Sequence, residues 1–277
     1  MSDAADALSP LIHHLCGGEP PLRIRFWDGS EIGPAAVVPP QRSSTETEAV
    51  IRVGNLTTRR LRGVSLSARR GEIVGLAGLE GQGQRDVLLE IWHNHRRLAD
   101  RTVHTRGSVA MVTGDRQTAG VFPLWALTTN VSIGALGAVS RHGVVMPRQE
   151  RKLAEEWIGR LAILGRLNSM ILDLSGGTQQ KVLLARAFAS AAEILLLDDP
   201  FRGVDVETKR EAYRLIHEEA ANGRCFLWYS SENVEMEQCD RACVFRAGSI
   251  VAELSGADVK EENIISASFE TASAAVE

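Results

Sequence analysis

The segment Gly78–Arg85 (GLEGQGQR) decides how this chain folds. It has the glycine spacing of the phosphate-binding loop G-x-x-x-x-G-K-[ST], with Gly78 and Gly83 at the two glycine positions. Gln84 stands where the lysine would contact the β- and γ-phosphates, and Arg85 stands where a hydroxyl would bind Mg²⁺. The segment is therefore either a chance cluster of glycines or a phosphate loop whose role has changed.

The residues on both sides of this loop favour the second interpretation. Before it, the apolar run 72–77 (EIVGLA) predicts a strand. After it, residues 84–92 have helical spacing, with Val87, Leu88, Ile91 and Trp92 on one face. A phosphate loop requires this strand–loop–helix context, and its backbone N–H groups and helix dipole attract anions even without the lysine.

Strands alternate with helices through the rest of the chain from residue 49. We expect strands at 49–53, 64–68, 109–112, 193–197, 225–229, 242–245 and 250–253, and helices at 148–164, 178–191, 206–221 and 261–269. This alternation predicts an α/β fold with a mostly parallel central sheet. Upstream, we expect poor order over 1–21, a hairpin within 22–38 and a linker over 39–48.

Composition narrows the function classes. The chain has 277 residues, 44% of them apolar, and a formal net charge of −4, so it offers no electrostatic case for nucleic acid. No apolar run approaches the ~20 residues of a membrane-spanning helix, and no secretory signal is recognisable. The histidines and cysteines lack the spacing of a metal site, which predicts reduced, unremarkable thiols.

Two further motifs point to phosphate chemistry. In Leu174–Lys181 (LSGGTQQK), a serine and two glycines precede a predicted helix, which is either another anion site or an ordinary serine N-cap with flexible glycines. About twenty residues later, the apolar strand 194–197 ends in Asp198-Asp199-Pro200. Proteins with a phosphate loop hold Mg²⁺ on carboxylates at the end of such a strand.

LSGGTQQK, LLLDDP and RGVDV (Arg202–Val206) together resemble the nucleotide-binding domain of ATP-binding cassette (ABC) transporters. GEIVGLAGLEGQGQR, GDR at Gly114–Arg116 and SSE at Ser230–Glu232 are most similar to the second of the tandem domains in ribose, galactose and xylose importers. The resemblance implies a P-loop NTPase of the ABC type over 49–270. It also implies an antiparallel β-subdomain, a helical signature subdomain over about 114–180 and a tail over 271–277.

The resemblance also implies a role for each motif residue. The chain's own nucleotide loop would comprise Gly78, Glu80, Gly81, Gln82, Gly83, Gln84 and Arg85. Asp198 would hold Mg²⁺, and Asp199 would position the attacking water, weakly because the family expects the longer glutamate. Ser231 stands at the position of the switch histidine, and Gly114 stands where a glutamine senses the γ-phosphate. The own site is therefore expected to be degenerate.

The signature segment, in contrast, is intact. ABC domains act as head-to-tail pairs in which the LSGG motif of one domain closes over ATP bound to the other. The resemblance therefore gives this role, acting in trans, to Ser175, Gly176, Gly177 and Gln179. ATP and Mg²⁺ are the implied cofactors, and their binding at the chain's own loop is left open.

The expected function is that of an ATP-binding subunit of a carbohydrate importer, peripheral on the cytoplasmic face of the plasma membrane. Its expected partners are a second nucleotide-binding domain, a membrane permease and, indirectly, a periplasmic or extracellular sugar-binding protein. The segment Gly114–Ile133 would lie near the permease, with Phe122 and Trp125 either docking there or serving the core. Two alternatives are a truncated, inactive remnant of a tandem ABC protein and a soluble, non-transport ABC protein.

Overall fold

The computed structural model describes residues 24–25, 31–32, 49–95, 102–115 and 120–269. The chain divides into two compact units, Met1–Val38 and Pro39–Glu277. In the first unit, β1 (Ile24–Arg25) pairs antiparallel with β2 (Glu31–Ile32), which confirms the predicted hairpin. The predictions for 1–21, 39–48 and 271–277 lie outside the described residues.

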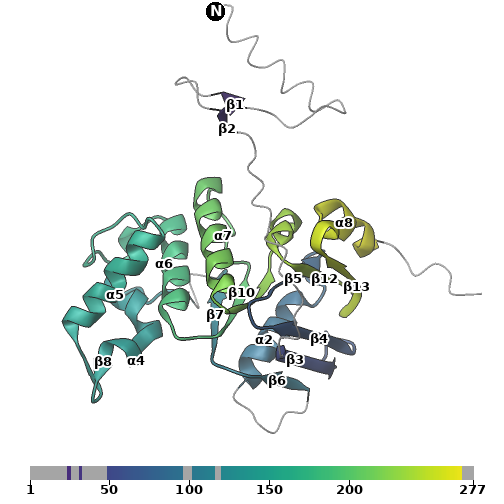
Figure 1. The fold of residues 1–277 in the computed structure, drawn as a ribbon, viewed down its shortest axis with the longest axis horizontal. Coiled ribbons are helices and arrows are strands. Elements are labelled where there is room, and N and C mark those ends of the chain that lie inside the picture. The colour runs from purple at the N-terminus through teal and green to yellow at the C-terminus, as the bar shows by residue number, and fades with distance from the viewer. Residues whose placement is uncertain (1–23, 26–30, 33–48, 96–101, 116–119, 270–277) are drawn as a thin grey trace, which may run out of the picture. The chain divides into compact units, whose positions relative to one another are not determined.

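A six-stranded, mostly parallel sheet forms the centre of the second unit, as predicted (Figure 1). Its order is β13-β12-β5-β11-β10-β7, and only β13 at the edge runs antiparallel. The strands are β5 (Ile73–Gly78), β7 (Val109–Thr113), β10 (Ile194–Asp198), β11 (Cys225–Tyr229), β12 (Arg241–Arg246) and β13 (Ser249–Ser255). Because β5, β10 and β11 are parallel neighbours, the glycine loop, Asp198 and Ser230 emerge at the same edge.

A smaller antiparallel sheet, in the order β4-β3-β6, lies beside helix α2. It comprises β3 (Ala49–Leu56), β4 (Val64–Arg69) and the short strand β6 (Val103–Thr105), and α2 spans Gln84–Asn94. Val87, Leu88 and Ile91 of α2 are completely buried in the hydrophobic cluster that this sheet shares with the central sheet. The helical periodicity after the glycine loop therefore identified the buried face of α2 correctly.

The other helices pack against the opposite face of the central sheet or beside it. They are α3 (Leu127–Ser132), α4 (Leu136–Val139), α5 (Pro147–Arg160), α6 (Gly176–Ala189), α7 (Val206–Ala221) and α8 (Glu261–Phe269). Figure 1 shows α4, α5 and α6 gathered on one side together with the hairpin of β8 (Ser140–Arg141) and β9 (Val144–Val145). This helical group carries the signature segment at the start of α6.

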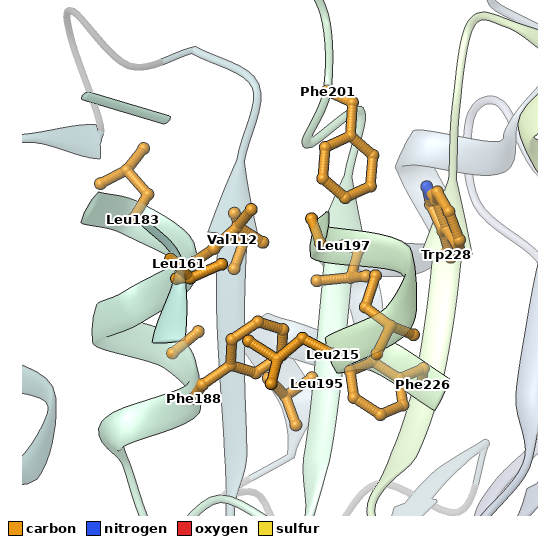
Figure 2. Packing of buried hydrophobic residues seen from close by; sticks show 14 of the residues in the cluster. Val112, Leu161, Leu183, Phe188, Leu195, Leu197, Phe201, Leu215, Phe226 and Trp228 are labelled. Atoms are coloured by element: carbon orange, nitrogen blue, oxygen red, sulfur yellow. The ribbon is translucent and has the colours of Figure 1, made fainter. Parts of the chain in front are cut away.

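The main core lies between the central sheet and helices α6 and α7 (Figure 2). Phe188 of α6 is fully buried between Trp157 and Phe226, with ring centroids at 5.8 and 6.3 Å. Phe201, which follows the Asp198-Asp199-Pro200 turn, packs edge-on against Trp228 at 5.4 Å. Buried aromatic rings on the α6 and α7 face of the sheet therefore hold the strands that carry the site.

The predicted helix 148–164 ends earlier than expected, at Arg160. Ala162 adopts a left-handed conformation with φ 45°, and the Ile163 N–H bonds the Ile158 carbonyl in the turn that closes the helix. Alanine strongly favours continued helix, so the sequence held no local signal for this ending. The short elements β6, α3, α4, β8 and β9 were not predicted. Each is too short for its hydrophobic residues to show a helical or strand periodicity.

Candidate nucleotide site at the edge of the sheet

The glycine loop connects β5 to α2, and its backbone requires glycine at both ends. Gly78 and Gly83 have φ of 119° and 115°, values that residues with a side chain rarely adopt. A Cβ at Gly78 would lie 2.5 Å from the Phe245 carbonyl oxygen, and one at Gly83 would lie 2.9 Å from a methyl of Leu61. The glycines therefore serve close packing as well as conformation.

Two glutamine side chains of the loop hydrogen-bond to backbone groups and so stabilise the conformation of the loop. Gln84 is buried, and its Nε2 donates to the carbonyl oxygens of Ala77 at 3.2 Å and Leu79 at 2.9 Å. The Oε1 of Gln82 accepts from the backbone N–H of Ala247 at 2.7 Å. A neutral amide thus replaces the ammonium that would neutralise phosphate charge, while the backbone groups at the start of α2 remain without a side-chain cap.

Arg85 contacts the carboxylate that sequence reasoning assigned to a metal. Its Nε lies 2.9 Å from Oδ2 of Asp198, whose side chain is only 3% exposed. Arg85 therefore places its guanidinium directly against the predicted metal ligand. Burial raises the pKa of Asp198 above its ordinary value, and the Arg85 guanidinium opposes that rise.

Asp199 and Ser231 hydrogen-bond to each other. The Ser231 hydroxyl donates to Oδ2 of Asp199 at 3.0 Å, and the Ser231 backbone N–H donates to Oδ1 at 3.2 Å. Asp199 itself adopts a left-handed backbone with φ 49°. The structure therefore brings together the two predicted residues at the glutamate and histidine positions, and it ties the carboxylate of one to the hydroxyl of the other.

Gly114 approaches these carboxylates through its backbone. A Cβ on Gly114 would lie 2.8 Å from the Asp199 carbonyl oxygen and 3.0 Å from that of Asp198. A side chain at the predicted glutamine position would therefore need the backbone to shift. The close approach of this loop to the backbone of Asp198 and Asp199 therefore favours glycine at position 114.

A cavity of about 360 Å³ lies between these residues. Its charged lining comprises Glu80, Arg85, Asp115, Asp198, Asp199 and Arg202, and Gly114 and Tyr229 complete it. Sequence reasoning did not assign roles to Asp115, Arg202 and Tyr229. Their location in the sequence could have indicated that they lie at the site. Asp115 and Arg202 belong to the GDR and RGVDV motifs, and Tyr229 ends the buried strand before Ser230-Ser231.

The donor set fits Mg²⁺ poorly. Mg²⁺ requires near-octahedral coordination by oxygen atoms. Arg85 already binds Asp198, Ser231 occupies both oxygens of Asp199, and the loop Gly78–Arg85 contains no hydroxyl. Within the described part of the chain, no group of three or more acidic, histidine or cysteine side chains is arranged to hold a metal ion.

The signature segment opens helix α6 at the surface. Ser175 is the exposed N-cap, and its Oγ accepts from the Thr178 backbone N–H at 3.3 Å. Gln179 donates to the Leu174 carbonyl oxygen at 2.9 Å, which closes the turn before the helix. None of these residues lines the cavity beside Asp198, so the signature segment lies outside that cavity.

The segment after Ser231 is fixed by an ion-pair cluster. Lys209 of α7 lies 2.8 Å from Glu232 and 2.7 Å from Glu235, and the Glu235 side chain is 2% exposed. Burial raises the pKa of Glu235, and Lys209 opposes that rise. The cluster connects α7 to the turn that carries Ser231.

We expect Glu235→Gln to reduce the pH dependence of stability. A raised pKa in the folded state means that the stabilisation is complete below the ordinary pKa of 4.5 and is lost as pH rises through the folded-state pKa. The free energy of unfolding is measured by urea denaturation at several pH values. The difference between the variant and wild type should shift in favour of the variant as pH rises. Lys209→Met removes the charge that opposes the rise in the Glu235 pKa, so the free energy of unfolding of this variant should fall more steeply than that of wild type as pH rises. Parallel pH profiles for all three proteins would contradict this assignment.

The strand–glycine loop–helix, with carboxylates and a serine at the ends of neighbouring parallel strands, defines an α/β protein of the P-loop class. Solved structures share the fold. The dimeric structure of a bacterial ABC transporter cassette matches with a TM-score of 0.63 at 22% identity, covering 74% of this chain and 98% of that chain. The structure of cbiO1 from Clostridium perfringens, part of an ABC transporter complex, matches with a TM-score of 0.63 at 18% identity, covering 78% and 92%.

The chain belongs to the ABC transporter family. The family model described as ABC transporter matches residues 61–202. A ribose import ATP-binding protein of Rhizobium etli is 39% identical over 227 residues, which cover 76% of this chain and 44% of the relative. One of Rhizobium meliloti is 34% identical over 259 residues, covering 87% and 50%. These matches confirm the resemblance to the ABC ATPase domain.

The chain spans about half the length of the curated relatives that it matches. Among the described residues, no helix is both long enough and apolar enough to cross a membrane.

Proposed function

We propose that the chain is the ATP-binding subunit, or the second half of one, in an ABC-type carbohydrate importer, with a degenerate site of its own and a signature segment that acts in trans. The names and similarity of the ribose import relatives support the substrate class. One observation supports the trans role of the signature segment and the degenerate own site together: the difference between the start of α6 and the Asp198 carboxylate. The signature N-cap is intact and exposed, whereas Arg85 occupies the carboxylate at the chain's own site.

Weak catalysis at the own site follows from the contacts there. Phosphoryl transfer depends on positioning and on stabilising the charge of the transferred group. Gln84 supplies no charge, and its amide is bonded to the loop carbonyls. Asp199 is shorter than glutamate and bonded to Ser231, and a displacement of about 1 Å can cost ~10²-fold in rate.

The signature segment retains the hydrogen-bond donors that would contact ATP bound to a partner domain. Ser175, Gly176 and Gly177 place a hydroxyl and the first backbone N–H groups of the 14-residue helix α6 at the surface. A helix N-terminus of this kind attracts phosphate oxygens and stabilises developing negative charge. In this proposal the partner is another nucleotide-binding domain that has an intact lysine and hydroxyl in its own phosphate loop.

A contact with the membrane permease is proposed for the surface around Phe122 and Trp125. Their rings stack at 4.3 Å, and the two residues are 40% and 37% exposed. The neighbouring Leu124 is 81% exposed. An exposed apolar group of this kind supports docking against another protein. A sugar-binding protein would act through the permease, and the subunit would work on the cytoplasmic face of the membrane.

The trans role is tested by mixing the chain with a cognate domain whose phosphate loop is intact. We expect Ser175→Arg to lower the ATPase activity of the mixture by about 10²-fold, because the arginine blocks the helix N-terminus that would close over the partner's ATP. The measurement is phosphate release by the mixture and by each chain alone, and the wild-type chain alone should release almost none.

The matched control is Ser266→Arg, which adds the same side chain at an exposed serine of α8. This control should leave the activity of the mixture intact. Full activity with Ser175→Arg would refute the trans role. Rapid hydrolysis by the wild-type chain alone, abolished by Asp198→Ala, would instead refute the proposal of a degenerate own site.

A further inference from the structure

The ion pair between Arg85 and Asp198 stands where a P-loop protein needs a divalent cation. Arg85 is the second residue of α2, and Asp198 is the last residue of β10, so the pair joins the glycine loop to the carboxylate strand. We propose that the Arg85 guanidinium permanently replaces the divalent cation at Asp198, so that this chain's own site excludes Mg²⁺.

Competition for Asp198 explains the exclusion. A metal ion entering the cavity would have to displace a charged hydrogen bond of 2.9 Å on a side chain that is 3% exposed. At the neighbouring Asp199, a metal ion would compete with the Ser231 hydroxyl and N–H for the carboxylate oxygens. The loop offers no hydroxyl in exchange, because Arg85 itself stands at that position. Oδ2 of Asp198 and both carboxylate oxygens of Asp199 are therefore already engaged.

The arginine also retains the structural connection that a metal would make. A bound cation joins a phosphate loop to the carboxylate strand only while nucleotide and metal are present. Arg85 is covalently part of α2, so it connects α2 to β10 whatever is bound. The inference thus rests on and deepens the proposed function, because it makes the degenerate site a fixed connection between α2 and β10 rather than a site that opens and closes with each turnover.

The experiment measures Mn²⁺ binding by electron paramagnetic resonance on the full chain, with and without ATP. Wild type should bind Mn²⁺ at least ~10-fold more weakly than Arg85→Ser, which frees Asp198 and supplies the missing hydroxyl. Arg85→Gln serves as a second variant if Arg85→Ser folds poorly, since it removes the charge while keeping a hydrogen-bond donor. Circular dichroism melting checks that each protein is folded.

Arg202→Ser is the matched control. Arg202 lines the same cavity, but among the described residues it forms no ion pair with Asp198. Its replacement should therefore leave Mn²⁺ binding as weak as in wild type. Binding by wild type as tight as by Arg85→Ser would overturn the proposal. Weak binding by both Arg85 variants would also overturn it, because Arg85 would then not be what excludes the metal. The chain is tested alone, so either result is independent of the trans experiment with Ser175.

Discussion

Trp228→Ala should lower the free energy of unfolding by about 3–5 kcal/mol. Trp228 lies on β11 in the middle of the central sheet and is completely buried. Its ring packs against Phe201 at 5.4 Å and Tyr213 at 5.5 Å, and Figure 2 shows it among the other buried side chains of this core. Truncation would leave a cavity between β11 and α7 that strands hydrogen-bonded on both sides cannot collapse to fill. The measurement is equilibrium urea denaturation followed by circular dichroism.

Trp228→Phe is the matched control. It keeps an aromatic ring in the core and removes an indole N–H that is buried without a hydrogen-bond partner among the described residues. A buried unsatisfied donor costs roughly 1–3 kcal/mol, which offsets part of the lost volume. We therefore expect Trp228→Phe to cost much less than Trp228→Ala. Equal losses for the two variants would show that shape complementarity of the indole, rather than filled volume, determines stability here.

The sequence predicted the central sheet and most of its helices because their periodicity is long and regular. Helices α2 and α7 begin where expected, at Gln84 and Val206, and β11 spans the expected Cys225–Tyr229. The turn at Ala247-Gly248 joins the predicted strands 242–245 and 250–253, and both of its residues adopt left-handed backbone with φ of 49° and 84°. Buried faces, caps and turn residues are local properties that sequence carries directly.

Side-chain partners at the site could not be predicted in the same way. Arg85 and Asp198 lie 113 positions apart, and their pairing depends on the reach of a long side chain across the loop. Asp199 and Ser231 are likewise brought together by the parallel neighbours β10 and β11. Motif positions indicated which residues would gather at this edge. Which of them would bond to each other is decided by rotamers that sequence spacing does not contain.

Arg186→Met should cost on the order of 3–5 kcal/mol, because it removes the link between α6 and the segment that bears Phe122 and Trp125. The Arg186 guanidinium donates to the carbonyl oxygens of Gly120 and Asn130, both at 2.7 Å, and to the Asn130 side chain at 2.8 Å. A buried acceptor left unpaired costs roughly 1–3 kcal/mol. This cost falls on the two carbonyl oxygens, because Oδ1 of Asn130 keeps the Phe122 N–H as a donor at 3.0 Å. Burial lowers the pKa of Arg186 to about 10, so the group stays charged at neutral pH.

The loss should be local as well as global. Arg186 also lies over the Phe122 ring, 5.0 Å from its centroid, so its removal frees the stacked pair of Phe122 and Trp125. Hydrogen exchange followed by mass spectrometry should show faster exchange over 120–130, with little change in the central sheet. Arg186→Lys, the matched control, keeps the charge but lacks the planar fork that reaches several acceptors, so it should restore only part of the protection. Full protection in Arg186→Met would mean that the buried Asn130 side chain, which also bonds the carbonyls of Phe122 and Trp125, holds this surface without the arginine.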